Sequence, residues 1–228
     1  MLVLTTVAYT AVAPGSGSAN FPTQAGESRQ VAETLVLQHG VSPDAGYAGT
    51  TDVVITNLWE NAQLGGWDAL DTYRDDQERH RILIRFDLGP LPPGAQIQSA
   101  ALSLYHVDSE YDNAPQTVSA YRLTAPWTEG TGIETAPEPD GATYTLAAPG
   151  IPWATPGGDF DATGIASTVV PAFTFPGWID WDLTGLMRQW ASGAVPNYGV
   201  ILRTSDADYF GHLFYSRNYA ADAALRPR

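Results

Sequence analysis

Apolar and polar residues alternate along much of this chain, which is the pattern of β-strands with one buried face. In residues 97–107 (IQSAALSLYHV), successive side chains would point to opposite sides of such a strand. Similar segments, some of them continuous apolar runs, lie at residues 34–38, 51–56, 81–88, 117–123, 198–204 and 213–216. Glycine and proline, with 22 and 17 residues, favour turns between short strands. The pattern therefore predicts an all-β fold.

One segment has the spacing of a helix instead. In residues 180–193 (DWDLTGLMRQWASG), Asp182 or Thr184 can cap the start and Gly193 can end the helix. Apolar residues recur at helical spacing at Leu183, Leu186, Met187 and Trp190. We expect this helix to cover one end of the β-structure.

Two long stretches carry no strand pattern. Residues 57–80 are irregular and rich in Asp, Glu, Asn and Gly. Residues 126–165 are rich in Pro and Gly and contain Trp127 and Trp153. Because the second stretch is too long for a simple connection, we expect a surface excursion packed by its own aromatic residues.

The N-terminal segment predicts a strand outside the main domain. Residues 1–13 could be the apolar part of a signal peptide, but they lack a positively charged leader. Their alternation favours a strand of the mature protein, with four residues on one face: Met1, Val3, Val7 and Tyr9. Residues 14–30 are small, polar and broken by Pro and Gly, as in a linker. We therefore divide the chain into a strand at 1–13, a linker at 14–30 and a domain at 31–228.

Composition excludes several functional classes. There are 25 acidic and 11 basic residues, all of the latter arginine, which give a net charge of −14 and disfavour nucleic acid as a partner. The chain has no cysteine, so it has neither disulfides nor cysteine metal sites. It has no apolar run of about 18 residues, so we expect no membrane span.

Three stretches carry a resemblance to a known family. They are RILIRFDLGPLPPGAQIQSAALSLY at residues 81–105, APWTEGTG at 125–132 and WDLTGLMRQWASGAVPNYGVILR at 181–203. Together they resemble the DNRLRE-domain family, also described as carbohydrate-binding module family 96, over roughly residues 31–228. The six-residue tag that names the family matches only loosely, at DQERHR in residues 76–81.

The resemblance implies a jelly-roll β-sandwich in a secreted or cell-surface protein. Some members are similar to modules that bind uronic-acid polysaccharides, and sandwiches of this kind commonly hold structural calcium. Members close with a strand after the final proline, whereas this chain ends at Pro227 and Arg228. Residues 1–9 (MLVLTTVAY) look like that closing strand, and we expect them to lie beside the domain's last strand.

The sequence argues against an enzyme. The four histidines, at 39, 80, 106 and 212, are scattered and show no metal-ligand spacing, and His106 lies in an alternating strand, which favours packing. There is no nucleophile elbow, phosphate loop or zinc-protease motif. Paired carboxylates could serve a glycosidase, but pairs are inevitable among 25 acidic residues.

Calcium and sugar each have candidate residues. Calcium takes 6–8 oxygen ligands from irregular loops, and we expect it as a cofactor. Its candidate ligands are Asp52, Asn57, Glu60, Asp68, Asp71, Asp75, Asp76, Asp206 and Asp208. Loop aromatics could stack on a glycan or pack their own loops: Trp59, Trp67, Tyr73, Trp127 and Trp153.

These observations lead to competing functions. The first is a calcium-stabilised structural subunit of an extracellular filament, a head-to-tail homopolymer in which residues 1–9 complete the sandwich of a neighbour. The alternative is a carbohydrate-binding module for an acidic, uronic-acid polysaccharide. A third is one unit of a tandem array, and the 24-residue span of 10–33 is also long enough to let the strand fold back into its own domain.

Overall fold

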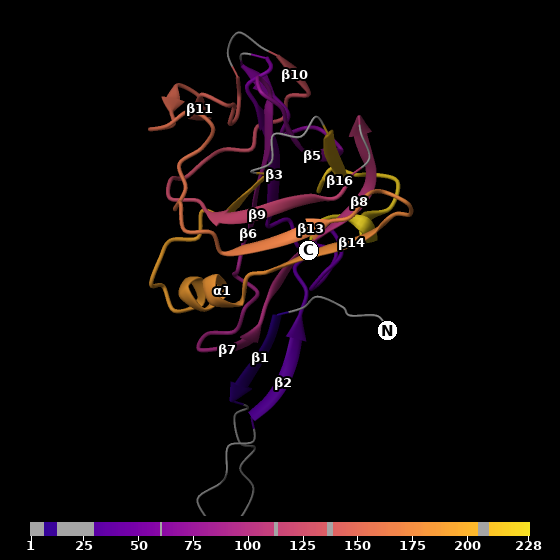
Figure 1. The fold of residues 1–228 in the computed structure, drawn as a ribbon. Coiled ribbons are helices and arrows are strands. Elements are labelled where there is room, and N and C mark those ends of the chain that lie inside the picture. Colours follow the sequence, from indigo (N-terminus) through magenta and orange to yellow (C-terminus); the bar gives the residue numbers. More distant parts are fainter. Residues whose placement is uncertain (1–6, 13–29, 60, 112–113, 136–138, 205–209) are drawn as a thin grey trace, which may run out of the picture.

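The computed structural model describes residues 7–12, 30–59, 61–111, 114–135, 139–204 and 210–228 and confirms the all-β sandwich (Figure 1). The first half of the chain contains β1 (Val7–Val12), β2 (Gln30–Leu35), β3 (Thr50–Thr56), β4 (Ala62–Gln63), β5 (Ala69–Arg74), β6 (Arg79–Phe86), β7 (Gln96–Ser99), β8 (Ala101–Tyr111) and β9 (Gln116–Arg122). The second half contains β10 (Glu134–Thr135), β11 (Leu146–Ala148), β12 (Ile151–Pro152), β13 (Ala166–Val170), β14 (Gly177–Asp182), α1 (Thr184–Ala191), β15 (Val200–Thr204), β16 (Phe210–Tyr215) and a 3-10 turn (Ala223–Leu225).

Most strands form one continuous sheet that bends into two layers. The strand order is β13-β9-β15-β6-β5-β16-β8-β14, and β3 also pairs with β6. Strands β5 and β6 share the residue pair Tyr73 and His80 at the bend. One layer therefore contains β3, β6, β15, β9 and β13, and the other contains β5, β16, β8 and β14.

The first layer is buried on both faces, which explains its apolar strands. Along β6, Ile82 and Ile84 face the other layer, while Leu83 between them faces outward. The outward face is covered by the excursion, whose Trp127 and Trp153 pack on it. A strand that is covered on both sides reads as a continuous apolar run rather than an alternating one.

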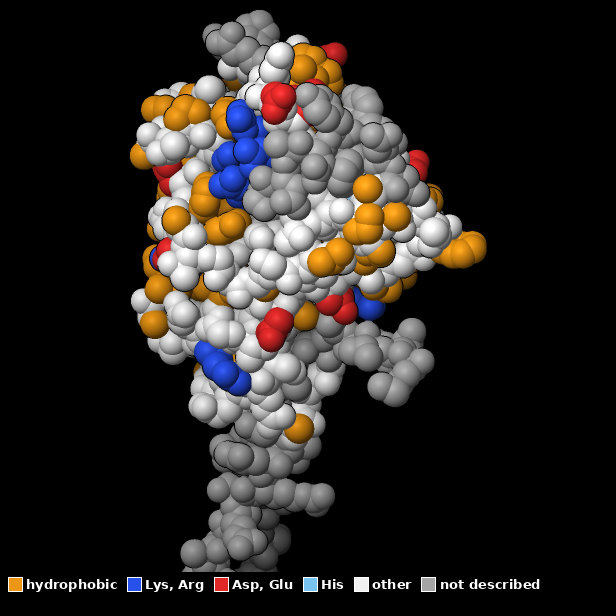
Figure 2. Space-filling view, in the orientation of Figure 1, with side chains coloured by type: hydrophobic (Ala, Val, Ile, Leu, Met, Phe, Trp, Pro, Cys, Tyr) orange, Lys and Arg blue, Asp and Glu red, His pale blue; other side chains and the backbone are white. Residues whose placement is uncertain are grey.

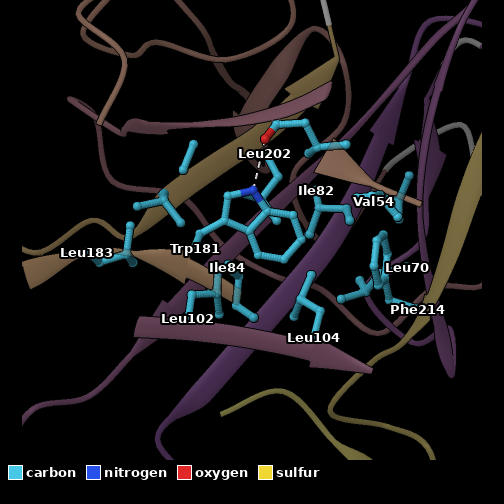
Figure 3. Packing of buried hydrophobic residues seen from close by; sticks show 14 of the residues in the cluster. Val54, Leu70, Ile82, Ile84, Leu102, Leu104, Trp181, Leu183, Leu202 and Phe214 are labelled. Atoms are coloured by element: carbon cyan, nitrogen blue, oxygen red, sulfur yellow. Dashed lines mark hydrogen bonds between the residues drawn. The ribbon is translucent and has the colours of Figure 1, made fainter. Parts of the chain in front are cut away.

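Trp181 lies at the centre of the core between the two layers (Figure 3). It is fully buried, and its indole N–H donates to the Val118 carbonyl at 2.9 Å. Because Trp181 belongs to β14 and Val118 to β9, this bond joins strands of opposite layers. The rings of Trp181 and Phe214 meet edge to face at a centroid distance of 6.1 Å.

The predicted helix is present as α1. Leu186 and Met187 are buried, and Gly193 follows the helix with a φ of 71°, a conformation that glycine adopts easily. At the start, the Thr184 N–H donates to Asp182 Oδ1 at 2.8 Å. Arg188 fixes the helix by donating to the carbonyls of Ile97 and Gln98.

The prediction of an irregular stretch at 57–80 is partly wrong, because it contains β4 and β5. Strand β5 (ALDTYR) cannot be recognised from alternating apolar and polar residues, because the buried polar residues Asp71 and Thr72 interrupt the pattern. Strands β13 and β14 were also not predicted. The excursion at 126–165 is confirmed, with only short strands in it.

The predicted position of the N-terminal strand is wrong. Residues 1–6, including Met1 and Val3, lie outside the described residues, but β1 carries Val7 and Tyr9. It pairs with β2 (Val7 opposite Leu35) and with β7 (Ala8 opposite Ser99), not with the last strand, β16. This pairing lies within one chain, as the fold-back alternative expects, and donation to a neighbouring chain stays a prediction.

The last residue of the chain pairs with β8. Arg228 and Ser103 exchange both backbone hydrogen bonds, at 2.7 and 3.1 Å, which is the pattern of an antiparallel pair. Strand β1 instead belongs to a separate three-stranded sheet of order β2-β1-β7. In the described parts of the chain, no helix has the length and apolar character needed to cross a membrane.

Candidate functional site: an arginine-lined pit

A cluster of arginines lines one small pit in this acidic protein. Its walls contain Arg74 from β5, Arg79 and Arg81 from β6, and Arg203 from β15. Figure 2 shows that arginine side chains (blue) gather on the upper part of the face in view, above a group of hydrophobic side chains. We call these four residues the arginine cluster.

Strand geometry brings the cluster together. Arg79 and Arg81 are two residues apart on β6, so both point to the outward face of the first layer. Leu202 pairs with Ile82, which places Arg203 of β15 beside Arg81. Like charges on neighbouring strands are destabilising, so the fold retains this arrangement at a cost.

The cluster is partly compensated, because Arg81 donates to the Gly157 carbonyl and the charge of Arg79 acts on Asp75. In the parts of the chain that the structure describes, no carboxylate forms an ion pair with Arg79, Arg81 or Arg203. Burial lowers the pKa of Arg81, and the charges of Arg203, Arg79 and Arg74 lower it further against the opposing effect of Tyr144. Four arginines around one pit outnumber the three neighbouring carboxylates of Asp71, Asp75 and Glu78, so an anionic ligand would relieve the repulsion among them.

Aromatic rings surround the guanidinium groups. The Arg81 guanidinium lies 5.5 Å from the ring centre of Tyr144. Arg203 lies 5.8 Å from that of Tyr121 and 5.5 Å from that of Phe160. Arginine within about 6 Å of a ring is attracted to it, so these rings hold the two guanidinium groups in place.

A histidine between two carboxylates also lines the pit. The Nδ1 atom of His80 lies 2.6 Å from Asp71 Oδ2, and its Nε2 atom lies 2.6 Å from Glu78 Oε1. Burial alone would lower the pKa of His80, but the hydrogen bond and charge of Asp71 and the charge of Glu78 outweigh burial and raise it. Since both ring nitrogens face carboxylates, His80 does not present a free base to a ligand.

The pit is too small for a sugar ring and has room for about one oxygen atom of a ligand. Its volume of about 10 Å³ corresponds to roughly one water molecule. A carboxylate oxygen of a ligand lying across the surface would fit, and arginine is the preferred partner of carboxylates. The arrangement can therefore hold an acidic group.

Two further polar clusters are buried and structural. Glu129 accepts from the Asp52 N–H at 2.9 Å and from Nε of Arg217, which ties β3 to the excursion and to the loop after β16. In the core, His212 Nδ1 lies 3.1 Å from His106 Nε2. Burial lowers the pKa of His212 to about 4, so this ring is neutral at neutral pH.

The described calcium candidates do not converge on one site. Asp52 is buried and accepts from the Arg217 N–H at 2.7 Å, Asp71 contacts His80, and Asn57 accepts from the Arg79 N–H at 2.6 Å. Asp75 caps its own turn by accepting from Gln77 at 2.7 Å and from Glu78, while Asp68 and Asp76 are exposed. Glu60, Asp206 and Asp208 lie outside the described residues. Within the described ranges, no three His, Asp or Glu side chains are grouped to hold a metal ion.

Calcium binding nevertheless stays a prediction for the whole chain. If the protein binds calcium only when folded, a hundredfold excess over the dissociation constant stabilises it by about 2.7 kcal/mol. Thermal melting in excess calcium should then occur several degrees above melting in chelator. Equal melting temperatures in calcium and in chelator, confirmed after prolonged dialysis against chelator, would contradict calcium binding by the folded protein.

The predicted stacking residues divide into buried and accessible ones. Trp127 and Trp153 are 5% and 4% exposed and donate to the carbonyls of Tyr198 and Thr143, so they pack the excursion rather than a ligand. Tyr73 is buried and donates to Asp75. Trp67 is partly buried and donates to the Ile133 carbonyl, whereas Trp59 is 46% exposed. Trp59 follows Asn57, the residue that accepts from Arg79, by two positions.

The arginine cluster was not predicted from the sequence. One signal was present, because Arg79 and Arg81 interrupt an apolar strand at a period of two and must share a face. The approach of Arg203, more than 120 residues later, depends on the pairing of β15 with β6. That pairing cannot be read from local pattern.

Comparison with known proteins identifies the family. A search of curated proteins finds no match. The sequence model of carbohydrate-binding module family 96 matches residues 27–150, which is more than half of the chain and includes Arg74, Arg79 and Arg81. The match confirms the resemblance noted from the sequence, and the chain belongs to carbohydrate-binding module family 96.

Proposed function

We propose that this protein is a non-catalytic module that binds an acidic polysaccharide, of the uronic-acid class, across the arginine cluster. The observation that carries the proposal is that four of only 11 arginines line one pit in a chain of net charge −14. A protein of this charge repels polyanions in general, so a local positive field gives selective attraction at one place. We expect the protein to act outside the cell or at its surface, where such polymers occur.

The surroundings of the cluster support a polymer rather than a free ion. The small pit accepts one acidic group, while the rings of Tyr121, Tyr144 and Phe160 border it. Exposed Trp59 lies two residues after Asn57, whose side chain accepts from the Arg79 N–H, and offers a further ring. A chain of uronic acids presents both features that these groups recognise, namely regularly spaced carboxylates and apolar sugar faces.

The double variant Arg79→Ala with Arg203→Ala is expected to weaken binding to a polyuronate at least tenfold. Each hydrogen bond to a charged group contributes roughly 1.5–3 kcal/mol, and about 1.4 kcal/mol is tenfold in affinity. Titration calorimetry with alginate and polygalacturonate oligomers measures this. Wild-type affinity should also fall between 0.1 and 1 M salt, as the screening length shortens from about 10 Å to about 3 Å.

Arg122→Ala is the matched control. Arg122 lies on β9 and pairs with Asp161 at 3.1 Å, away from the pit lining. This variant removes one positive charge and should bind like the wild type. An affinity that is unchanged in the double variant, or the absence of binding to every acidic polymer tested, would contradict the proposal.

Head-to-tail assembly is not part of this proposal. The pairing of β1 with β2 and β7 accounts for the strand within one chain. Donation of residues 1–9 to a neighbour stays a prediction from the sequence.

A further inference from the structure

A second pocket lies at the opposite end of β6 from the arginine cluster. It has a volume of about 530 Å³, within the roughly 300–1,000 Å³ of typical ligand pockets. Arg85 and Phe86 of β6, Asp87 and Leu88 after it, Thr51 of β3 and Trp190 of α1 are among its walls. Arg81 and Asp87 are six residues apart, or about 20 Å along extended chain, so the two sites are separate.

The charge of this pocket differs from that of the arginine cluster. Arg85 and Asp87 contribute one positive and one negative charge, and the remaining lining residues are uncharged. Arg85 is held over the ring of Trp127 at 5.7 Å, and the Asp87 carboxylate accepts from the Gly89 N–H at 3.1 Å. A site with balanced charge has no general preference for an anion, and it suits an uncharged ligand with many hydroxyl groups.

The walls combine an aromatic, apolar surface with a few polar side chains. Trp190 and Phe86 are partly buried against the core and give the pocket an aromatic side. Asn197 is fixed beside them by donating to the Phe86 carbonyl at 2.9 Å.

We propose that this pocket binds a neutral sugar residue, with the Trp190 side as the apolar wall and Arg85 and Asp87 as hydrogen-bonding groups. An apolar, aromatic wall with a few convergent polar groups is the usual form of a small-molecule site. A neutral pyranose has an apolar face for the ring and hydroxyls that both donate and accept. The protein then carries two glycan sites of different charge preference at the two ends of one strand.

The test uses the full chain and a panel of neutral oligosaccharides, namely cello-, xylo-, manno- and malto-oligosaccharides at millimolar concentration. Titration calorimetry should detect binding of at least one of them. Asp87→Ala should lower that affinity at least fivefold, because it removes a charged acceptor from the pocket. The cluster variant Arg79→Ala with Arg203→Ala should leave it unchanged.

Asp44→Ala is the control for Asp87→Ala. The exposed Asp44 carboxylate accepts from the Gly46 N–H at 2.7 Å, the same two-residue turn bond that Asp87 makes, but outside the pocket. Retained binding in this control with loss in Asp87→Ala supports the proposal. It is overturned if no neutral oligosaccharide binds, if Asp87→Ala binds like the wild type, or if the cluster variant abolishes the neutral-sugar binding. None of these results depends on whether a polyuronate binds the arginine cluster.

Discussion

Trp181→Ala is expected to lower the free energy of unfolding by about 4 kcal/mol, within the roughly 3–5 kcal/mol typical of this change in a core. Trp181 is fully buried, and the rings and aliphatic side chains around it come from both layers (Figure 3). Alanine leaves a cavity at the centre of the sandwich and leaves the Val118 carbonyl without its indole donor. Urea unfolding followed by circular dichroism measures the loss.

Two variants separate the causes of this loss. Trp181→Phe keeps much of the apolar volume but removes the indole N–H, so it should cost less than alanine and still more than a surface change. Trp59→Ala removes a tryptophan that is 46% exposed and should change stability by about 0.5 kcal/mol or less. Similar losses for Trp181→Ala and Trp59→Ala would show that the core is centred elsewhere.

Asp52→Asn is expected to remove a large pH dependence of stability. Asp52 is fully buried, and burial is the main reason why its pKa is raised to about 8, with the nearby Glu129 charge adding to the effect. The folded state therefore holds a proton that the unfolded state has lost above about pH 4. The bound proton contributes its full stabilisation below about pH 4. This stabilisation decreases as the pH rises and is lost once the pH exceeds about 8, the folded-state pKa.

The expected size follows from the width of that pH range. At about 1.4 kcal/mol per pH unit, the wild type should lose roughly 5 kcal/mol relative to Asp52→Asn between pH 4 and 8. Asparagine resembles the protonated acid in shape and can still accept from the Arg217 N–H, so the two proteins should be similarly stable at pH 4. Urea unfolding of both proteins at several pH values measures the difference. Parallel stability curves would mean that Asp52 is ionised in the folded protein at neutral pH.

The sequence was sufficient for the parts of the fold that local pattern determines. Strand β6 and helix α1 were both predicted because their apolar spacing matches one element type. Strand β5 was missed because it carries two buried polar residues, Asp71 and Thr72, whose partners are His80 and Gln116. A buried polar pair removes the alternation on which the prediction depends.

The candidate site was harder to predict from the sequence than the fold, because it also depends on contacts between distant residues. Tryptophans in a loop-rich stretch suggested stacking platforms, yet Trp127 and Trp153 are the residues that attach the excursion to the first layer. Composition alone cannot distinguish an aromatic residue that packs its loop from one that faces a ligand. The arginine cluster depends on long-range strand pairing, and an overall charge of −14 conceals it.

The proposed polysaccharide site is built from two parts of the molecule, the central sheet and the excursion at 126–165. These two parts differ in how well they tolerate substitutions. The four arginines project from β5, β6 and β15, whose replacement would disturb the central sheet. Two of the bordering rings, Tyr144 and Phe160, come from the excursion or its connection to β13. With Trp127 and Trp153 as anchors, Tyr144 should be replaceable at a smaller cost to stability than residues of the sheet, whereas Phe160 also packs against the cluster around these anchors. Related proteins would thus keep the arginines that recognise charge, while the residues of the excursion that contact the sugar vary. A library of variants mutated only in the excursion should therefore contain proteins with altered sugar specificity and an unchanged fold.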